Sequence, residues 1–292
     1  MSVQYKEFAG TTLRLPEIGF GTWGYQGGVA PLRRAIDLLG VSLIDTAESY
    51  GTEETVGDAI RGARDRVFIA TKVRPRHFRH ADVLTAADQS LKRLRIDHID
   101  LYQLHWPNYT VPIEETMAAM EALVDRGKVR FIGVSNFSVR DLKKARAALS
   151  KYTILSNQVR YNLIDRTIEG GLLHYCQQHD IAILAYSPLA HGLGHIKERD
   201  RDQVLPRVSR LTGKSEAQVA LNWCVAKASV IAIPTASSID HVEEDCEASG
   251  WRLSPEQIDL LDRGIQFRRR GHVETGLRGI ARHFLQKLGY NQ

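Results

Sequence analysis

Short apolar runs, often rich in β-branched residues, recur along this chain, and each is followed by a stretch with helical periodicity. Runs of four to eight such residues between turn signals are typical of buried strands in a parallel sheet. Eight strands are predicted, at 18–21, 43–45, 67–71, 99–104, 129–134, 155–159, 181–185 and 230–233. Their spacing, roughly 25 to 35 residues on average, is the length of one βα unit.

The segments between these runs carry the signals of amphipathic helices. One apolar face is predicted from a spacing of three to four residues among Val83, Ala87, Leu91 and Leu94. Two helix starts are predicted by capping boxes, in which a serine is followed three residues later by a glutamine: Ser215 with Gln218, and Ser254 with Gln257.

The first residues have the pattern of a β-hairpin, with strand-like runs at 3–8 and 11–15 and Ala9-Gly10 as the turn. The βα units then run on without a long linker. The expected fold class is therefore α/β, as a parallel (β/α)8 barrel with an N-terminal β-hairpin, forming a single domain over 1–292. A doubly wound open sheet is the competing architecture, and the continuous series of eight units favours the barrel.

A glycine motif near the first strand imitates a dinucleotide-binding fingerprint. Gly19, Gly21 and Gly24 match G-x-G-x-x-G, and Asp45 follows at about the distance of the acidic residue in that motif. The fingerprint needs a helix that starts inside it and points its N-terminus at a pyrophosphate. Here the next helix is not expected before about Pro31, so we interpret the motif as a glycine-rich loop.

Composition excludes a disordered chain, since 43% of the 292 residues are hydrophobic and 25% are charged. The net charge of +5 lies in residues 266–292, where six Lys or Arg oppose one Glu, and the other 265 residues are balanced. A dedicated nucleic-acid binder would carry its charge across the fold. We therefore expect no nucleic-acid partner.

The basic tail, 264–292, has its own helical pattern, with apolar residues at Leu277, Ile280, Ala281, Phe284, Leu285 and Leu288. Three interpretations stay open. The helix packs on the barrel with a solvated basic face, or 268–270 lean over the barrel mouth and favour anions, or the helix meets another subunit or an acidic partner.

Three separated cysteines, Cys176, Cys224 and Cys246, argue against a disulfide framework and for a reducing compartment. The first fifteen residues contain no apolar run like that of a signal peptide, and no stretch approaches the roughly 18 apolar residues of a membrane helix. We expect a soluble cytoplasmic protein without a membrane partner, as a monomer or small homo-oligomer.

Four polar residues follow three consecutive predicted strands. Asp45, Lys72 and His105 stand at strand ends, and Tyr50 lies in the loop after Asp45. Catalytic residues of a (β/α)8 barrel come from these carboxyl ends. Taken singly, each residue has a structural explanation, such as a helix cap or a lysine whose ammonium reaches out to solvent. Four together at one face point to chemistry.

This set can handle a proton. An ammonium beside a tyrosine is expected to lower the tyrosine pKa from about 10 and so make it a proton donor and acceptor near neutrality. A carboxylate keeps the lysine charged, and a neutral histidine can orient a carbonyl oxygen. The histidine pairs His77 with His80 and His191 with His195 lack evident partners, so no metal site is expected.

These residues lie in strings that resemble the aldo-keto reductase superfamily from the hairpin to about residue 263. The strings are GFGTWGY, LIDTAESYGTEETVGDAI, FIATKV, DLYQLHWP, GKVRFIGVSNFS, SNQVRYN, AYSPLAHGLG, AQVALNW and IPTASS, in matching order and spacing. The resemblance implies a barrel whose lower end is plugged by the hairpin. It also implies hydride transfer from an extended nicotinamide cofactor without a Rossmann domain.

The resemblance assigns roles to residues of this chain. Tyr50 would be the general acid, tuned by Lys72 and Asp45, and His105 would orient the substrate carbonyl. Trp23 and Trp106 match positions that line the substrate pocket of the family and would form an apolar wall against which the substrate lies. The positions that match cofactor contacts are Thr22, Trp23, Asp45, Ser135, Asn136, Gln158, Tyr186, Ser187, Pro188, Leu189, Gly192, Ile233, Thr235, Ser237, Ser238, His241, Glu244 and Asp245.

One part departs from the family pattern. Many relatives carry a Lys or Arg directly after Ile-Pro, and an Arg six residues further, which grip the 2′-phosphate of NADP. This chain has Thr235 and His241 there, with no Lys or Arg from Ser229 to Gly250. Asp245 also stands where asparagine is usual. We expect NADP(H) to be favoured from the family, with use of NAD(H) open.

The function expected from these residues is the NAD(P)H-dependent reduction of an aldehyde or ketone to an alcohol. Two alternatives come from the same superfamily: an NAD-linked sugar or polyol dehydrogenase, and a cofactor-sensing accessory subunit with little turnover. The complete set of four residues argues against the accessory subunit. A barrel that runs proton chemistry without a cofactor is a third alternative, which binding of NAD(P)H would exclude.

Overall fold

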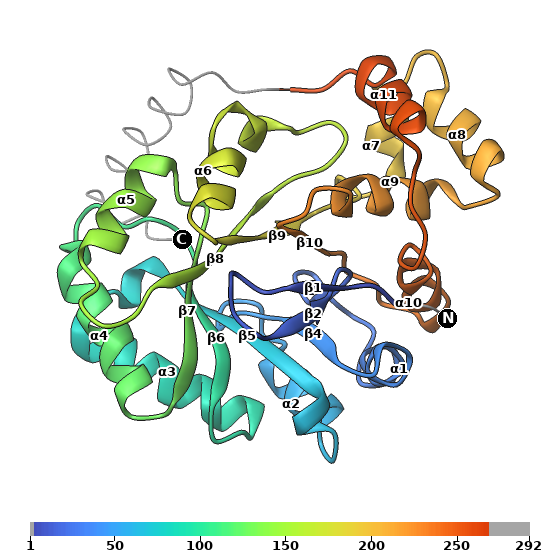
Figure 1. Ribbon diagram of the computed structural model, residues 1–292. Coiled ribbons are helices and arrows are strands. Elements are labelled where there is room, and N and C mark those ends of the chain that lie inside the picture. Colours follow the sequence, from blue (N-terminus) through green and yellow to red (C-terminus); the bar gives the residue numbers. More distant parts are fainter. Residues whose placement is uncertain (1–2, 269–292) are drawn as a thin grey trace.

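A ring of parallel strands forms the centre of the computed structural model, which describes residues 3–268. Each strand pairs with its successor in the chain, in the order β3 to β10 (Figure 1). The strands are β3 (Phe20–Gly21), β4 (Ser42–Asp45), β5 (Val67–Val73), β6 (Ile99–Leu104), β7 (Val129–Ser135), β8 (Ile154–Arg160), β9 (Ala182–Tyr186) and β10 (Val230–Ile233). All eight strands predicted from the apolar runs are confirmed.

The ring closes between its first and last strands. Backbone hydrogen bonds join Gly19 N to Ala232 O at 2.8 Å and Gly21 N to Pro234 O at 2.7 Å. A Cβ added to Gly19 would lie 2.9 Å from the Leu43 side chain, so this glycine allows close packing of the first two strands. The sheet is therefore a closed (β/α)8 barrel, and the doubly wound alternative is wrong.

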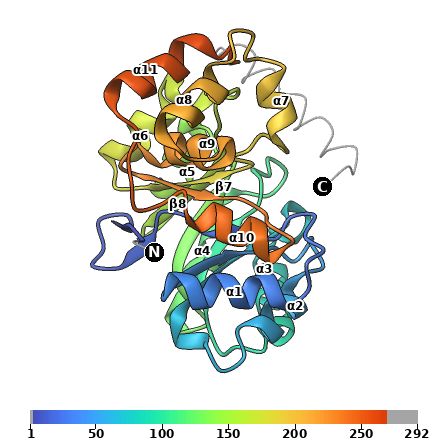
Figure 2. The same ribbon diagram turned by 90° about the vertical axis from the view of Figure 1, so that its right-hand side faces the viewer.

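Helices surround the barrel on its outer side (Figures 1 and 2). They are α1 (Ala30–Leu39), α2 (Glu53–Ala59), α3 (His80–Leu94), α4 (Ile113–Asp125), α5 (Val139–Ala147), α6 (Leu172–Gln178), α7 (Leu193–Lys197), α8 (Val204–Thr212), α9 (Glu216–Val225), α10 (Ile239–Cys246) and α11 (Pro255–Gly264). Short 3₁₀ turns lie at Arg64–Arg66, Pro75–His77 and Thr167–Gly170. Both predicted capping boxes are present, at the starts of α9 and α11. Helix α1 starts at Ala30, which agrees with the glycine-loop interpretation of the preceding motif.

The N-terminal hairpin plugs one end of the barrel. Its strands, β1 (Tyr5–Glu7) and β2 (Arg14–Pro16), are shorter than predicted, because Thr11 and Thr12 belong to the turn. Ala9 and Gly10 both have positive φ, 54° and 67°, as a tight hairpin turn requires. Phe8 and Leu15 pack in the barrel interior with Leu43, Phe68 and other inward-facing side chains.

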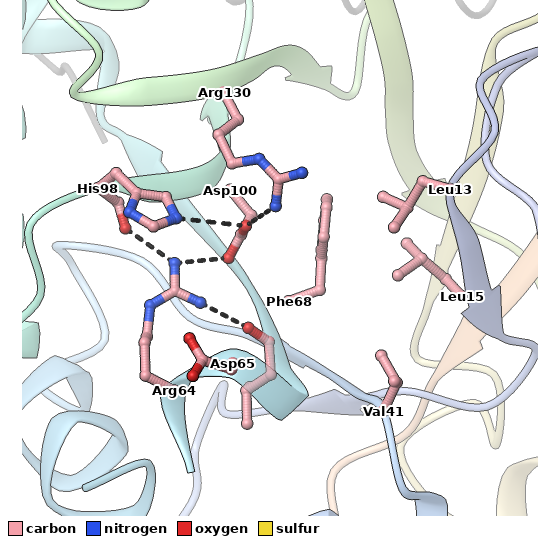
Figure 3. A pocket seen from close by; sticks show the side chains of 10 residues that line it. Leu13, Leu15, Val41, Arg64, Asp65, Phe68, His98, Asp100 and Arg130 are labelled. Carbon is pink, nitrogen blue, oxygen red and sulfur yellow. Dashed lines mark hydrogen bonds and ion pairs between the residues drawn. The ribbon is translucent and has the colours of Figure 1, made fainter. Parts of the chain in front are cut away.

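The plugged end contains an ionic cluster around the buried carboxylate of Asp100, beside a hollow of about 200 Å³. The Asp100 carboxylate lies 2.8 Å from Arg64 and 2.7 Å from Arg130, and it accepts a hydrogen bond from the backbone N–H of Ile69. Figure 3 shows these groups converging on one side of the hollow, opposite Leu13 and Leu15 of the hairpin segment. Strands β5, β6 and β7 begin here, so this cluster ties their amino ends together.

The chain leaves α11 toward the loop after β8. Gln266 N donates to Arg199 O at 3.0 Å, and Arg268 N donates to Ile164 O at 2.9 Å. Of the basic tail, 264–292, the structure describes residues up to Arg268, so the tail helix and its three interpretations lie outside the described residues. In the described residues, no helix has the length and apolar character needed to cross a membrane.

The ionic cluster leads to a test of stability. We expect Asp100→Asn to lower the free energy of unfolding by about 2 to 3 kcal/mol, because two arginines then lose the charge that compensates them. Urea unfolding followed by circular dichroism measures this change. Asp37→Asn is the matched control, since Asp37 is exposed and lies 3.5 Å from Arg66; its expected effect is within about 0.5 kcal/mol. Equal effects of the two substitutions would contradict the assignment.

Candidate active site

The four polar residues singled out in the sequence meet at the end of the barrel opposite the hairpin. Asp45 is the last residue of β4, Lys72 lies near the end of β5, and His105 directly follows β6. Tyr50 reaches the same place from the loop between β4 and α2. Because the strands are parallel, their carboxyl ends share one face, and the structure places all four side chains there.

Lys72 is the centre of this cluster. Its side chain has no exposed surface, and its ammonium contacts three oxygens. It donates to Asp45 Oδ2 at 2.7 Å, to the backbone oxygen of Thr46 at 2.9 Å and to Tyr50 Oη at 3.3 Å. All three ammonium protons are thus used, so the position of the charge is determined by its surroundings.

Tyr50 and His105 form the part of the cluster nearest to the mouth. Tyr50 Oη lies 3.3 Å from His105 Nε2, and the two rings pack edge to face at 5.5 Å. The Lys72 ammonium also lies 4.7 Å from the centre of the Tyr50 ring. Tyr50 Oη therefore stands between a cation and an imidazole, which is where a carbonyl oxygen would accept its proton.

The direction of the Tyr50 pKa corrects the expectation from sequence. Burial raises the pKa of Tyr50, and the Lys72 ammonium opposes this change without reversing it. The predicted decrease was wrong because the position of an ammonium can be inferred from strand ends, whereas the desolvation of the phenol depends on packing. Tyr50 is therefore a protonated donor across the neutral range in this structure.

Two of the other titratable groups, His105 and Lys72, have the charge states expected of them. Burial, together with Lys72 and Arg74, lowers the pKa of His105 to about 3, so its imidazole is neutral. Burial disfavours the Lys72 ammonium, but Asp45 and Tyr50 outweigh this effect and the Lys72 pKa is raised. The cluster thus combines a neutral imidazole, a neutral phenol and a charged ion pair.

Two glutamine side chains hold the carboxylate that faces Lys72. Asp45 Oδ1 accepts from Gln158 Nε2 at 2.7 Å and from Gln103 Nε2 at 3.3 Å. Gln158 was predicted as a cofactor contact, and its link to Asp45 was missed. Gln103 was missed altogether, although its place two residues before His105 on an inward-facing strand position was a usable signal.

The rim beside the cluster carries amide and hydroxyl groups suited to a carboxamide. Ser135 Oγ and Asn136 N both donate to the backbone oxygen of Gln158. Asn136 Nδ2 donates to the backbone oxygen of His105 at 3.3 Å, and Tyr186 Oη donates to Asn136 Oδ1 at 3.0 Å. The structure thus brings together Ser135, Asn136, Gln158 and Tyr186, as predicted for the nicotinamide end of a cofactor.

The loop after β9 has an unusual backbone. Ser187, Ala190 and His191 have positive φ values of 49°, 55° and 65°, and Gly192 has 131°. A positive φ at a non-glycine residue costs about 1 kcal/mol or more of folding free energy, and such backbone strain is often found at functional sites. Three of these residues, Ala190 to Gly192, follow one another in the chain. This loop contains the predicted positions Ser187, Pro188, Leu189 and Gly192.

The predicted adenosine-end residues lie at the last position of β10 and in the segment and helix that follow it. Thr235 and Ser237 are exposed, Ile233 is buried, and Ser238 caps α10 by accepting from the backbone N–H of His241 at 3.3 Å. The remaining two predicted residues, Glu244 and Asp245, follow on α10.

Helix α10 is acidic and carries no cation of its own. Burial, with Glu244 nearby, raises the pKa of Asp245 to about 8. The Arg34 guanidinium of α1 approaches α10, but it is paired with Glu243 at 2.6 Å. This neighbourhood therefore offers less positive charge for a 2′-phosphate than the family pattern does.

Three aromatic or hydroxyl positions complete the predicted set. Trp23 is 60% exposed, and its ring packs against His191 at 5.4 Å. Trp106 is partly buried directly after His105. Thr22 is buried and donates to the backbone oxygen of Asp45 at 3.1 Å, so it supports the end of β4.

Two further charged groups at the mouth were not anticipated. Glu48 lies 3.1 Å from His77 Nδ1 and accepts from the backbone N–H of Arg74, so His77 has an acidic neighbour that the sequence did not reveal. Arg160 ends β8 beside Tyr186. Within residues 3–268, no group of three or more His, Cys, Asp or Glu side chains is placed to hold a metal ion.

The fold and the cluster together define a class: a (β/α)8-barrel protein with a tyrosine-centred proton-transfer group at the catalytic end of the barrel. Comparison with known proteins narrows the class. The model of the aldo/keto reductase family matches residues 17–265. The chain therefore belongs to the aldo/keto reductase family, whose members are oxidoreductases acting on carbonyl groups.

Individual relatives are similar over nearly their whole length. Methylglyoxal reductase YeaE of Escherichia coli is 38% identical over 269 residues, which cover 88% of this chain and 93% of that protein. Glyoxal reductase of Bacillus subtilis is 32% identical, with 86% and 89% covered. A crystal structure of an aldo/keto reductase from Klebsiella pneumoniae in complex with NADP and acetate has a TM-score of 0.81 and 38% identity, with 93% and 98% covered.

The pKa directions lead to a test by pH. Tyr50 donates its proton from the neutral form, and its raised pKa keeps that form present until strongly alkaline pH. His105, with a pKa of about 3, is neutral throughout. We expect kcat for carbonyl reduction to be flat between about pH 5 and pH 9 and to fall above that range. A change in kcat with a midpoint near pH 6 to 7 that disappears in His105→Asn would contradict the assignment of a neutral imidazole to His105.

Proposed function

We propose that this protein reduces small aldehydes and ketones, including 2-oxoaldehydes, to alcohols with NADPH as the reductant and Tyr50 as the proton donor. The observation that carries the proposal is the position of Tyr50 Oη, 3.3 Å from both Lys72 Nζ and His105 Nε2 at the mouth of the barrel. The substrate class is supported by the names of the methylglyoxal and glyoxal reductases to which the chain is similar.

The residues of the mouth suit the nicotinamide end of the cofactor. Ser135, Asn136 and Gln158 would hold its carboxamide, and the Tyr186 ring would support its ring plane. The loop 187–192, which matches the pyrophosphate loop of the family, would follow the pyrophosphate. When bound, the cofactor supplies a hydride to the carbonyl carbon.

The chain's own residues then act on the carbonyl oxygen. His105 Nε2 and Tyr50 Oη together orient that oxygen and polarise its bond to carbon. As negative charge develops on the oxygen, the phenol transfers its proton there, and the Lys72 ammonium stabilises the phenolate that remains. Asp45 is a positioning residue in this scheme, because it acts on Tyr50 through Lys72.

The cellular setting also remains a proposal. The buried thiols of Cys176, Cys224 and Cys246 form no disulfide, which suits a reducing compartment such as the cytoplasm. A monomer or small homo-oligomer would suffice, because the four residues of the site come from one chain.

Removal of the phenol oxygen tests the proposed donor. We expect Tyr50→Phe to lower kcat with methylglyoxal by about 10² to 10⁴, the usual contribution of a positioned general acid. The NADPH dissociation constant, measured by fluorescence titration, should change less than about twofold. Tyr152→Phe is the control, since Tyr152 is an exposed tyrosine that donates to Asp125.

Full activity of Tyr50→Phe would contradict the mechanism. Equal losses in Tyr50→Phe and Tyr152→Phe would indicate damage to the fold rather than loss of a donor. Absence of multiple turnover with any carbonyl in the wild-type protein would favour the accessory-subunit alternative.

The cofactor's adenosine end allows a gain-of-affinity test. The family pattern places a Lys or Arg where this chain has the exposed Thr235. We expect Thr235→Lys to tighten NADPH binding about fivefold, the effect of one partly solvated ion pair. NADH has no 2′-phosphate, so its dissociation constant should change less than twofold and serves as the control. Equal tightening of both cofactors, or of neither, would show that Thr235 does not face the 2′-phosphate.

A further inference from the structure

An arginine that has no acidic partner within residues 3–268 lies on the inner face of the barrel mouth. Arg160 is the last residue of β8, and it pairs in register with Tyr186 at the end of β9. Gln158, two positions earlier on β8, points inward and binds Asp45. Side chains two apart on a strand project to the same side, so Arg160 lies on the interior side, one step nearer to the rim.

The contacts of Arg160 leave its charge unneutralised. Its Nη2 donates to His191 Nε2, 3.3 Å away, and its guanidinium lies 5.7 Å from the centre of the Tyr186 ring. Its Nε is buried and has no hydrogen-bond partner among the described residues. Over residues 3–268, no carboxylate lies within 4.0 Å of its guanidinium, whereas Arg74 at the same mouth is paired with Glu48.

Within residues 3–268, the side chains that contact Arg160 are His191 and Tyr186, and neither carries a negative charge; the Asp165 carboxylate contributes to raising the pKa of Tyr186. Burial and the adjacent Arg160 lower the pKa of His191, so its imidazole is neutral and accepts from the guanidinium. Tyr186 is a neutral phenol whose proton is donated to Asn136.

The buried Nε atoms of Arg64 and Arg74 also lack a hydrogen bond, but both of these arginines pair with a carboxylate. Arg160 differs from them in having no such anion among the described residues, and a buried charge without a partner is costly.

A short series of contacts joins Arg160 to the carbonyl site. Arg160 lies against Tyr186, Tyr186 donates to Asn136, and Asn136 donates to the backbone of His105. On the outer side, the exposed Trp23 packs against His191 and provides an apolar surface. A ligand whose carbonyl lies at Tyr50 and His105 would therefore meet an apolar wall and a cation within the same mouth.

We propose that Arg160 is a specificity-determining residue that makes the enzyme prefer aldehydes and ketones bearing a carboxylate over their uncharged counterparts. The planar guanidinium fork matches a carboxylate, and a hydrogen bond to a charged group contributes more than one between neutral groups. This inference rests on the proposed reductase function, since it concerns which carbonyl compounds that site accepts.

Matched pairs of substrates test the proposal. The pairs are succinic semialdehyde and its methyl ester, and para-carboxybenzaldehyde and its methyl ester, all assayed with NADPH on the full chain. We expect wild-type kcat/KM to be at least about tenfold higher for each acid than for its ester. Arg160→Gln should bring this acid-to-ester ratio close to one, mainly through KM of the acid, and Arg160→Lys should restore part of it.

Arg76→Gln is the matched control. Arg76 is an exposed arginine that also donates to a histidine nitrogen, in this case from its Nε to His77 Nε2, 3.2 Å away. Its replacement should leave the acid-to-ester ratio unchanged. A merely structural role of Arg160 would lower kcat/KM for acid and ester together and leave their ratio unchanged, which would overturn the proposal.

Two binding measurements distinguish this proposal from a role of Arg160 in cofactor binding and from failure of the proposed reductase function. If Arg160→Gln weakens NADPH binding and leaves the acid-to-ester ratio intact, Arg160 serves the cofactor phosphates and the proposal is wrong. Calorimetry with benzoate and benzamide on the enzyme saturated with NADP does not depend on turnover. We expect benzoate to bind more tightly and Arg160→Gln to abolish the difference, even if no aldehyde is reduced; equal affinities in the wild-type protein would overturn the proposal.

Discussion

The fully buried ammonium of Lys72 is the constraint on which the rest of the site depends. A charge without contact to water must find acceptors for all its protons, and Asp45, Thr46 and Tyr50 provide them. Because Asp45 ends β4 and Lys72 lies on β5, this ion pair requires two neighbouring strands to end in a particular register. The phenol of Tyr50 is then held where the barrel opens, next to a neutral imidazole.

The two ends of the barrel use charge in different ways. At the plugged end, Asp100 is surrounded by Arg64, Arg130 and a backbone N–H, so its hydrogen bonds are satisfied and the cluster stabilises the fold. At the open end, the Lys72 ammonium is paired with the Asp45 carboxylate. On the side of the mouth it contacts the neutral phenol of Tyr50. Arg160 remains without an acidic partner among residues 3–268. The strained backbone of the loop 187–192 lies at this open end as well.

Much of this arrangement could be predicted from the sequence, because it depends on strand ends. The apolar runs predict all eight strands, and parallel strands place Asp45, Lys72 and His105 at one face. The hairpin was predicted too long, since Thr11 has strand propensity but belongs to a turn. What depends on packing could not be predicted. The direction of the Tyr50 pKa follows from its burial, and the Gln103 and Gln158 contacts to Asp45 cross the barrel. That no carboxylate of residues 3–268 pairs with Arg160 is a property of the assembled mouth. The roles carried over from the family, residue by residue, stay predictions.

The central claim is that Asp45 acts on the reaction only through Lys72 and Tyr50. A double-mutant cycle of Asp45→Asn and Lys72→Met, read as the single-turnover rate of NADPH oxidation by one aldehyde at saturating cofactor, tests it most directly. The account predicts that Asp45→Asn slows the reaction by about 10² in the wild-type background and by less than about threefold once Lys72 is methionine. An equal loss in both backgrounds would contradict it, because Asp45 would then contribute independently of the lysine.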